Sequence, residues 1–422
     1  MGYKANIASN LFNQILRLLL GALTSILVAR ALGPAGQGYV AYIILMFTLL
    51  GDNGHLGLNN AVMYFQKRGG GDRQILFHTN LTALGLILAA ITALLLILRA
   101  GGMALANYSW LYILGGILFV GGDFLLTNHQ AWMVGDERIV EANRYILASF
   151  LLKGAALLLL WLFKALTPAT FFLVSVLAML LTAVLLHLRL RLRFRPLLDL
   201  NLLRSEFAYG SVIWLGAVFC FLHYRVDQFM IKKMLGISEL GVYAIAVTLA
   251  ELLFLIPLSI NSALLGRLYN TDTPQAARVL LAKTLRLSLW ICLLLALLGI
   301  PLSLLIPFFY GAAFAGAVLP TMVLLLGVVF ASLATVASQF YFSLGKPLYH
   351  LIITGATLLL NIGLNFLLIP RRGITGAAIA SSASYLAYGL SYLMLLARRD
   401  RFRLRELWLP SSSDFRDLWR RT

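Results

Sequence analysis

The chain is a succession of long apolar runs separated by short joints that are marked by glycine and proline. A helix that crosses the hydrocarbon core of a bilayer needs about 20 mostly apolar residues, and these runs are long enough. The composition agrees, because 61% of the 422 residues are hydrophobic and 12% are charged, against about 25% charged residues in soluble proteins. A soluble enzyme, a secreted disulfide scaffold and a disordered regulator are excluded. The sequence predicts an all-α polytopic membrane protein.

Twelve transmembrane helices are expected, in two pseudo-symmetric bundles of six. The domains expected are an N-terminal six-helix bundle over 1–188, a basic amphipathic cytoplasmic linker over 189–207, a C-terminal six-helix bundle over 208–397 and a basic cytoplasmic tail over 398–422. The helices are predicted at 7–30, 38–65, 76–98, 109–132, 144–164, 168–188, 208–231, 240–265, 280–309, 317–343, 348–369 and 374–397.

The positive charges predict the orientation. The net charge is +18, and with the N-terminus inside, 24 of the 34 lysines and arginines lie in inner segments while 7 lie in outer ones. Because cytoplasmic loops of membrane proteins are enriched in these residues, both termini are expected in the cytoplasm. The basic linker is expected to rest on the anionic inner leaflet. No soluble basic domain is present that could hold nucleic acid, so nucleic acid is not an expected partner.

An internal repeat indicates duplication. The segment LGPAGQGYVAY at 32–42 can be laid on LGISELGVYAIA at 235–246, and LNNA at 58–61 on INSA at 260–263. The two offsets are nearly equal and close to half the chain. Six helices return the chain to its starting side, so the halves are expected to be parallel repeats, an arrangement common in transporters that alternate access.

Charged side chains inside the predicted helices are the candidate functional residues. A charge at mid-membrane costs about 2.5–3.5 kcal/mol even on the lenient insertion scale, so each one indicates a cavity or a partner. On the first helix a polar stripe includes Arg17, either as a cavity wall that offers a guanidinium to phosphate or carboxylate, or as a buried ion pair with Asp52 or Glu251. The candidate cavity residues are Asn10, Asn13, Arg17, Asp52, His55, Asn59, Asp123, Lys153, Arg225, Asp227, Glu251, Asn361 and Asn365.

Spacing predicts which of these side chains could act together. In the helix at 38–65, Asp52, His55 and Asn59 are spaced to share a face, which permits a proton-coupling pair or a simple packing histidine. Arg225 and Asp227 are two residues apart, so each needs a partner of its own. The candidate partners on other predicted helices are Glu251, Asn361 and Asn365. The interior holds three cations against four acids, which leaves the sign of the cargo open.

Several chemistries have no signature here. The chain has no GxxxxGK[ST] loop for nucleotide hydrolysis and no His/Cys cluster of metal-ligand spacing, so no catalytic residue, metal or cofactor is expected. Every predicted outer loop is short, whereas a membrane glycosyltransferase, polymerase or ligase would usually carry a large catalytic loop. An enzyme is therefore disfavoured.

Three passages resemble a known family: YRVDQFMIKKMLGISELGVYAIA, LNIGLNFLLIPRRGITGAAIASSASYL, and the opening that runs through GDNGHLGLNNAVMYF. They are similar to the polysaccharide transporter branch (O-antigen-type, Wzx-like flippases) of the multidrug/oligosaccharidyl-lipid/polysaccharide exporter (MOP) superfamily. The resemblance implies a V-shaped protein like the multidrug exporters, with the polar positions Arg17, Asp52, Arg225 and Asp227 lining a central cavity.

The same resemblance implies the function. Members of this branch flip polyprenyl-pyrophosphate-linked oligosaccharides across the bacterial cytoplasmic (inner) membrane in cell-surface polysaccharide biosynthesis, and a gradient of H⁺ or Na⁺ is the expected drive. The partners implied are the lipid-linked oligosaccharide, membrane lipids, and the polymerase and glycosyltransferases of such a pathway. The alternative is a MATE-like cation-coupled multidrug exporter, in which interior acids would capture an amphiphilic cation.

Overall fold

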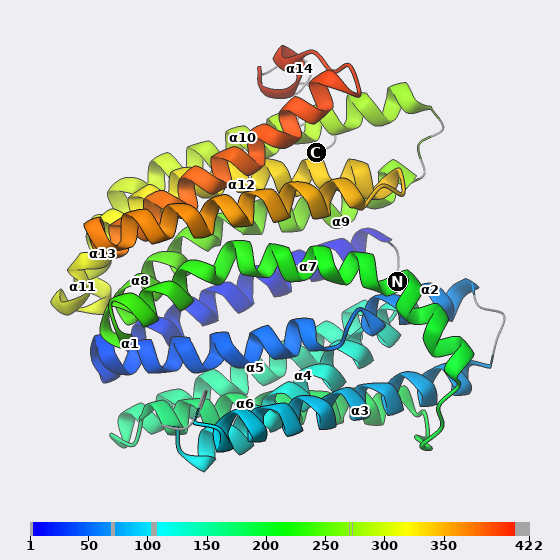
Figure 1. Ribbon diagram of the computed structural model, residues 1–422, viewed down its shortest axis with the longest axis horizontal. Coiled ribbons are helices and arrows are strands. Elements are labelled where there is room, and N and C mark those ends of the chain that lie inside the picture. The colour runs from blue at the N-terminus through cyan, green and yellow to red at the C-terminus, as the bar shows by residue number, and fades with distance from the viewer. Residues whose placement is uncertain (1–2, 69–71, 103–107, 270, 272, 410–422) are drawn as a thin grey trace. The chain divides into compact units, whose positions relative to one another are not determined.

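The computed structural model describes residues 3–68, 72–102, 108–269, 271 and 273–409. This part of the chain is built from helices and short turns and contains no strand (Figure 1). The predicted all-α membrane fold is confirmed. The side chains left undescribed inside these ranges are those of 3–15, 18, 60, 63, 67, 68, 262, 263, 266 and 269.

Ten helical segments of the described chain are long and apolar enough to cross a membrane. Two of them, α1 (Tyr3–Gly54) and α13 (Leu348–Arg398), are interrupted by a non-helical glycine, Gly33 and Gly373. Straight helices of 52 and 51 residues would be more than twice as long as a hydrocarbon core of about 30 Å. Figure 1 shows instead that each runs out, turns and returns. With both arms counted, the described chain has the twelve crossings that the sequence predicts.

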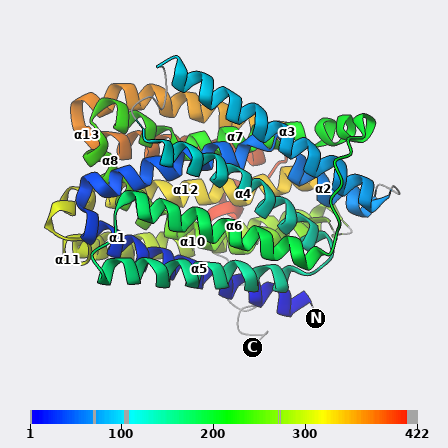
Figure 2. The ribbon, with the colours of Figure 1, turned by 90° about the horizontal axis from the view of Figure 1, so that it is seen from below.

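Internal contacts divide the chain into two compact units, Met1–Val218 and Phe219–Thr422. The first contains α1, α2 (Leu58–Arg68), α3 (Arg73–Ala100), α4 (Trp110–Gly135), α5 (Ile139–Leu162), α6 (Pro168–Leu190) and the start of α7 (Leu200–Met234). In it α4 packs along α6, and Figure 2 shows the pair from a second side. Phe47 and Phe119 both stack on Phe172, with ring centroids 5.8 and 6.4 Å away. These rings form the centre of the first unit's core.

The predicted helix at 38–65 is broken in the structure. α1 ends at Gly54 and α2 begins at Leu58, with positive φ angles of 53° at Leu56 and 86° at Gly57. A Cβ on Gly57 would lie 2.5 Å from the carbonyl oxygen of Gly210, so this backbone contact requires glycine. The expectation that Asp52, His55 and Asn59 share one helical face is therefore wrong, because the helical register is lost between them.

The second unit is organised around α12 (Val318–Ser343), which packs against α8 (Ile237–Ala250), α9 (Leu255–Tyr269), α10 (Pro274–Leu302) and α13. Shorter turns are η1 (Glu251–Phe254), η2 (Ser303–Leu305), α11 (Ile306–Tyr310) and η3 (Ala312–Ala317). The predicted tail begins with α14 (Leu404–Trp408), whose Leu407 is buried against this unit's core. Trp290 Nε1 on α10 donates to the carbonyl of Trp408 at 2.8 Å. The rest of the tail, 410–422, lies outside the described residues.

A 3₁₀ turn interrupts the predicted helix at 240–265. It spans Glu251–Phe254 and is followed by Pro257 in α9. Proline has no N–H, so it cannot bond the carbonyl of Leu253 four residues earlier. The tighter winding of a 3₁₀ turn is a common response to such a gap, and Glu251 is the first residue of this turn.

The two joints of the internal repeat have similar backbone conformations, with a positive φ and an extended ψ. Gly33 has φ 63° and ψ −176°, and Gly236 has φ 106° and ψ −179°. Residues with a side chain rarely adopt a positive φ with extended ψ, so both joints require glycine. The local geometry agrees with the duplication that the sequence predicts.

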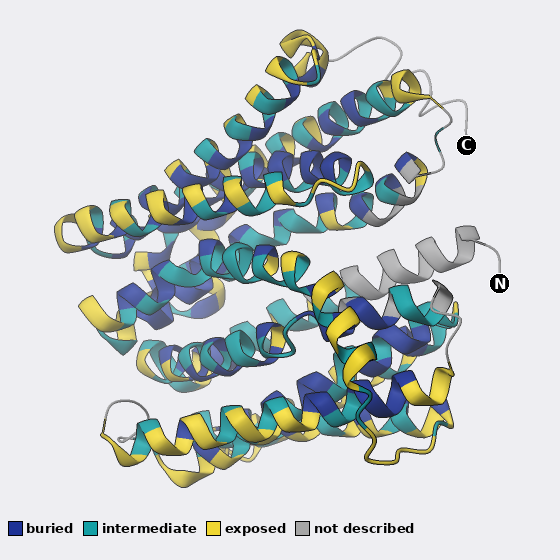
Figure 3. Cartoon of the chain, turned by 45° about the vertical axis from the view of Figure 1, so that its right-hand side comes forward, coloured by how far each residue is buried: buried dark blue, intermediate teal, exposed yellow. Residues whose placement is uncertain are grey.

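Most helices carry buried residues on one face and exposed residues on another (Figure 3). The exposed face is rich in large apolar side chains, for example Leu118 on α4, Leu159 on α5 and Leu359 on α13. An exposed apolar surface on this scale is expected where a protein contacts lipid and not water.

Candidate functional site

The predicted cavity residues of the first unit occupy different environments. Arg17 is partly buried on α1, whereas Asp52 is exposed near the end of the same helix. The side chains of Asn10 and Asn13 lie outside the described residues. His55 stays close to its own backbone, since its Nδ1 accepts a hydrogen bond of 3.0 Å from the Gly57 N–H. The histidine thus stabilises the break between α1 and α2.

A buried amide network connects α2, α3, α4 and α7 in this unit. Asn59 donates to Thr127 Oγ1 at 2.7 Å, and Asn128 Nδ2 donates to the amide oxygens of both Asn59 and Asn80. Asn80 in turn donates to Glu206 Oε1 at 3.0 Å. Of these residues, Asn59 alone is among the candidates from the sequence.

Glu206 is the least expected member of the network. It falls in the predicted linker, two residues before the helix predicted at 208–231, but α7 begins at Leu200 and Glu206 is 0% exposed. One carboxylate oxygen bonds Asn80, while Oε2 has no hydrogen-bond donor among the described residues. The signal in the sequence is a single acid between Ser205 and Phe207, close to a run of arginines.

Asp123 is also buried, at 7% exposure on α4. Its Oδ2 has no donor in the described part of the chain. The carboxylate lies against Gly51, where a Cβ would come within 2.9 Å of Oδ2. The glycine therefore makes room for the acid, and Asp123 keeps hydrogen-bonding capacity that the fold leaves unused.

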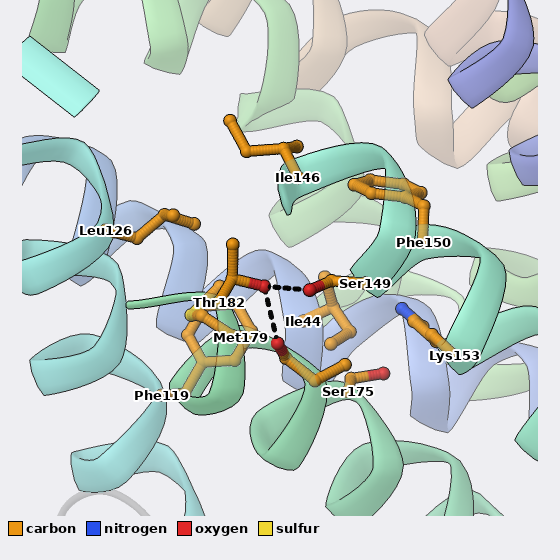
Figure 4. A pocket seen from close by; sticks show the side chains of 11 residues that line it. Ile44, Phe119, Leu126, Ile146, Ser149, Phe150, Lys153, Ser175, Met179 and Thr182 are labelled. Atoms are coloured by element: carbon orange, nitrogen blue, oxygen red, sulfur yellow. Dashed lines mark hydrogen bonds between the residues drawn. The ribbon is translucent and has the colours of Figure 1, made fainter. Parts of the chain in front are cut away.

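Lys153 lies at a cavity of about 190 Å³ among α1, α4, α5 and α6 (Figure 4). Figure 4 shows the lysine extending from α5 with its ammonium toward this cavity. The same walls carry three hydroxyl side chains, Ser149, Ser175 and Thr182, and Thr182 donates to Ser149. The remaining lining is apolar: Ile44, Phe119, Leu126, Ile146, Phe150, Ala178 and Met179.

Lys153 has no carboxylate partner among the described residues. Its ammonium instead lies over the ring of Phe171, 4.9 Å from the centroid. A cation–π contact contributes about 0.5–2 kcal/mol, which compensates only part of the cost of a charge in an apolar bundle. The cavity therefore combines an uncompensated cation with hydroxyl groups.

In the second unit Arg225 and Glu251 pair with each other. Two parallel hydrogen bonds of 2.7 and 2.9 Å join the guanidinium on α7 to the carboxylate in η1. Bidentate pairs of this kind are among the strongest in proteins. The sequence offers Glu251 as a partner either for Arg17 or for the pair Arg225 and Asp227, and the structure pairs it with Arg225.

Asp227 is the centre of a second buried cluster. Its Oδ2 accepts from Tyr243 Oη at 2.6 Å and from Ser381 Oγ at 2.7 Å, and its Oδ1 accepts from the Gln228 N–H at 2.7 Å. The carboxylate is 1% exposed. Arg225 and Asp227 thus have separate partners, as their spacing predicts.

Asn361 and Asn365 extend this cluster along α13. Ser384, one turn from Ser381, bonds the Ser381 carbonyl and accepts from Asn361 at 3.0 Å. Asn365 donates to Asn361, and its own Oδ1 has no donor among the described residues. The structure therefore brings Asp227, Asn361 and Asn365 into one chain of polar contacts through two serines that sequence analysis did not name.

Comparisons with known proteins agree with the fold. A profile of the MatE family matches residues 213–367. A comparison with curated protein sequences finds no significant match. The solved structure of a lipid II flippase, MurJ, in an inward closed conformation superposes with a TM-score of 0.77 at 15% identity, covering 94% of this chain and 88% of that one.

Two MATE transporters also match. An inward-facing multidrug resistance MATE family transporter of the MOP superfamily gives a TM-score of 0.66 at 14% identity, covering 93% of this chain and 95% of that one. A MATE transporter of Vibrio cholerae gives 0.66 at 14% identity, with coverage of 95% and 97%. The chain therefore has the fold of the MOP-superfamily transporters over nearly its whole length, with a MatE match in its C-terminal half.

Proposed function

We propose that this multi-pass membrane protein is a flippase that moves a polyprenyl-pyrophosphate-linked oligosaccharide across the bacterial cytoplasmic membrane by alternating access. The superposition on a lipid II flippase over most of both chains supports this proposal. Such a flippase requires a polar path through its apolar helices, along which the anionic head group crosses while the lipid tail stays in the bilayer.

The observation that carries the proposal is the charge state of the Lys153 cavity. In the second unit Arg225 is neutralised by Glu251, and Asp227 is surrounded by three hydrogen-bond donors. Lys153, in contrast, has no carboxylate partner in the described part of the chain, and its ammonium points toward a cavity. A cation in such a place favours an anion as its ligand.

The lining suits a sugar phosphate. An ammonium is a strong donor to phosphate oxygens, and hydroxyl side chains can exchange hydrogen bonds with sugar hydroxyls. Ser149 and Ser175 supply such groups close to Lys153. The cavity of about 190 Å³ holds only part of an oligosaccharide, so we assign it to the phosphate and the nearest sugar. Arg17 on α1 is the second cation that we expect to contact the pyrophosphate.

The Asp227 cluster is where we place the coupling ion. The carboxylate can take up a proton, and together with the amide and hydroxyl oxygens it offers the oxygen ligands that Na⁺ requires. Asn365 Oδ1, which lacks a donor among the described residues, is one oxygen that such a cation could use. The choice between H⁺ and Na⁺ is testable by the ion dependence of transport in proteoliposomes.

The second candidate is a cation-coupled multidrug exporter, and Asp123 is the observation that favours it. Its buried carboxylate oxygen, which has no donor among the described residues, could receive an amphiphilic cation, and two solved MATE transporters share the fold. The two candidates predict opposite roles for Lys153 and Asp123, so one set of variants separates them.

The test uses Lys153→Met and Asp123→Asn, with Lys164→Met as the matched control at an exposed cation just beyond α5. Lipid-linked oligosaccharide on the inner leaflet and dye efflux are measured in cells, and insertion is checked by the fluorescence of a C-terminal fusion. For a flippase, Lys153→Met should lower translocation by about tenfold or more, the loss expected for a charge-assisted contact. Lys164→Met should not.

Lys153→Arg keeps the charge and should retain most of the translocation. If Lys153→Met leaves glycan export intact while Asp123→Asn abolishes dye efflux, the exporter is the correct function and the flippase proposal fails.

A further inference from the structure

A second charged cavity lies in the first unit, at the start of α5 and the end of α6. Its volume is about 560 Å³, within the range of about 300–1,000 Å³ usual for ligand pockets. It is lined by Glu141, Arg144, Tyr145 and Ala148 from α5 and by Arg189 from α6. The distribution of arginines along the sequence assigns this end of the bundle to the cytoplasmic side.

The charges around this cavity do not balance. Glu141 is its one acid, and its Oε2 is held by Arg138 at 2.8 Å. Its other oxygen, Oε1, lies 3.9 Å from Arg189 Nε, which is the limit of an ion pair. Arg144 has no carboxylate partner among the described residues. One carboxylate therefore faces three guanidinium groups, and the cavity carries an excess of positive charge.

Other contacts hold the guanidinium groups of this cavity in place without neutralising their positive charge. The Arg189 guanidinium lies over the ring of Tyr145, 5.6 Å from its centroid. Arg138 donates two hydrogen bonds of 3.3 Å to the Arg189 carbonyl, which ties the end of α6 to the start of α5. Guanidinium groups held in this way lose less conformational entropy when they bind an anion.

We propose that this cavity binds the phosphate-bearing head group of a lipid in the inner leaflet. Two guanidinium groups, Arg144 and Arg189, supply the planar donors that phosphate oxygens accept. Tyr145 and Ala148 supply a wall for the glycerol or the first part of the tail. Basic pockets between transmembrane helices on the cytoplasmic side are typical sites for anionic lipid head groups. The site is separate from the Lys153 cavity and does not depend on the transported substrate.

The experiment titrates the purified full-length chain, in detergent and freed of lipid, with phosphatidylglycerol and counts bound lipid by native mass spectrometry. The double variant Arg144→Gln/Arg189→Gln should bind more weakly by roughly fivefold for each arginine, the effect expected of a basic residue at an anionic lipid surface. Arg193→Gln removes an exposed charge from the neighbouring linker and is the matched control. The proposal is overturned if the double variant binds no more weakly than Arg193→Gln.

A variant that is expected to strengthen binding shows that weaker binding in the double variant is not caused by misfolding. Glu141→Gln removes the one acid of the cavity and releases Arg138, so it should tighten phosphatidylglycerol binding by several fold; unchanged or weaker binding contradicts the proposal. Competition identifies the source of the phosphate. If farnesyl pyrophosphate displaces the bound lipid at a lower concentration than phosphatidylglycerol does, the cavity is assigned to a lipid pyrophosphate. If phosphatidylglycerol displaces it at the lower concentration, the cavity is assigned to a membrane phospholipid.

Discussion

Exchanging Glu251 for glutamine and Arg225 for methionine, singly and together, measures what this ion pair contributes to the second unit. The pair has two bonds of 2.7 and 2.9 Å, and its side chains are 28% and 25% exposed. Removing one member of a buried pair costs about 3–5 kcal/mol because the other charge is left uncompensated. Partial exposure lowers this cost, so we expect about 3 kcal/mol for each single variant.

The double variant leaves no unpaired charge and should cost little more than either single variant. The coupling energy of the cycle is then about 2 kcal/mol or more. The free energy of unfolding is measured by titration with SDS in mixed micelles, with the loss of helical circular dichroism as the signal. If the single effects add to the double effect within about 0.5 kcal/mol, the two side chains act independently and this reasoning is refuted.

Three further experiments test the first unit. Gly57→Ala places a Cβ 2.5 Å from a facing carbonyl oxygen at a residue with φ 86°, so it should destabilise the protein by more than about 2 kcal/mol. Gly85→Ala, with open space at its Cβ, should not destabilise it. Unfolding in SDS measures both variants. Asn80→Ala removes the donor to buried Glu206 and should cost about 3 kcal/mol in the same assay, with recovery when Glu206 is also replaced by leucine. Arg17→Ala with normal insertion should abolish surface polysaccharide without changing dye efflux; intact glycan together with raised drug sensitivity would contradict the assignment.

The number of crossings could be predicted from the sequence, but the break between α1 and α2 could not. The three glycines of GDNGHLG indicate a weak helix without saying where it ends. The break lies where Gly57 meets the backbone of Gly210, a residue more than 150 positions away. A contact between distant segments decides where the helix breaks, and the local helix propensity of the sequence does not indicate that contact.

The candidate site was predictable as a set of residues and not as a set of partners. Placing a charge in an apolar helix is costly, so Lys153, Arg225, Asp227 and Glu251 stand out without any structure. The partners of Asp227 are ordinary polar residues such as Ser381, which nothing in the sequence distinguishes from other serines. Glu206 was assigned to the linker because its neighbours are basic, and only the folded chain shows it buried.

The sequence by itself determined that the chain spans a membrane, how many times it crosses and where glycine and proline mark its joints. These properties follow from local hydrophobicity and backbone sterics, which each segment carries on its own. Tertiary structure decided which buried polar groups meet: Asn80 with Glu206, 126 residues apart, and Asp227 with Ser381, 154 residues apart. A hydrogen bond depends on geometry within about 3 Å, and only the packing of helices sets that geometry.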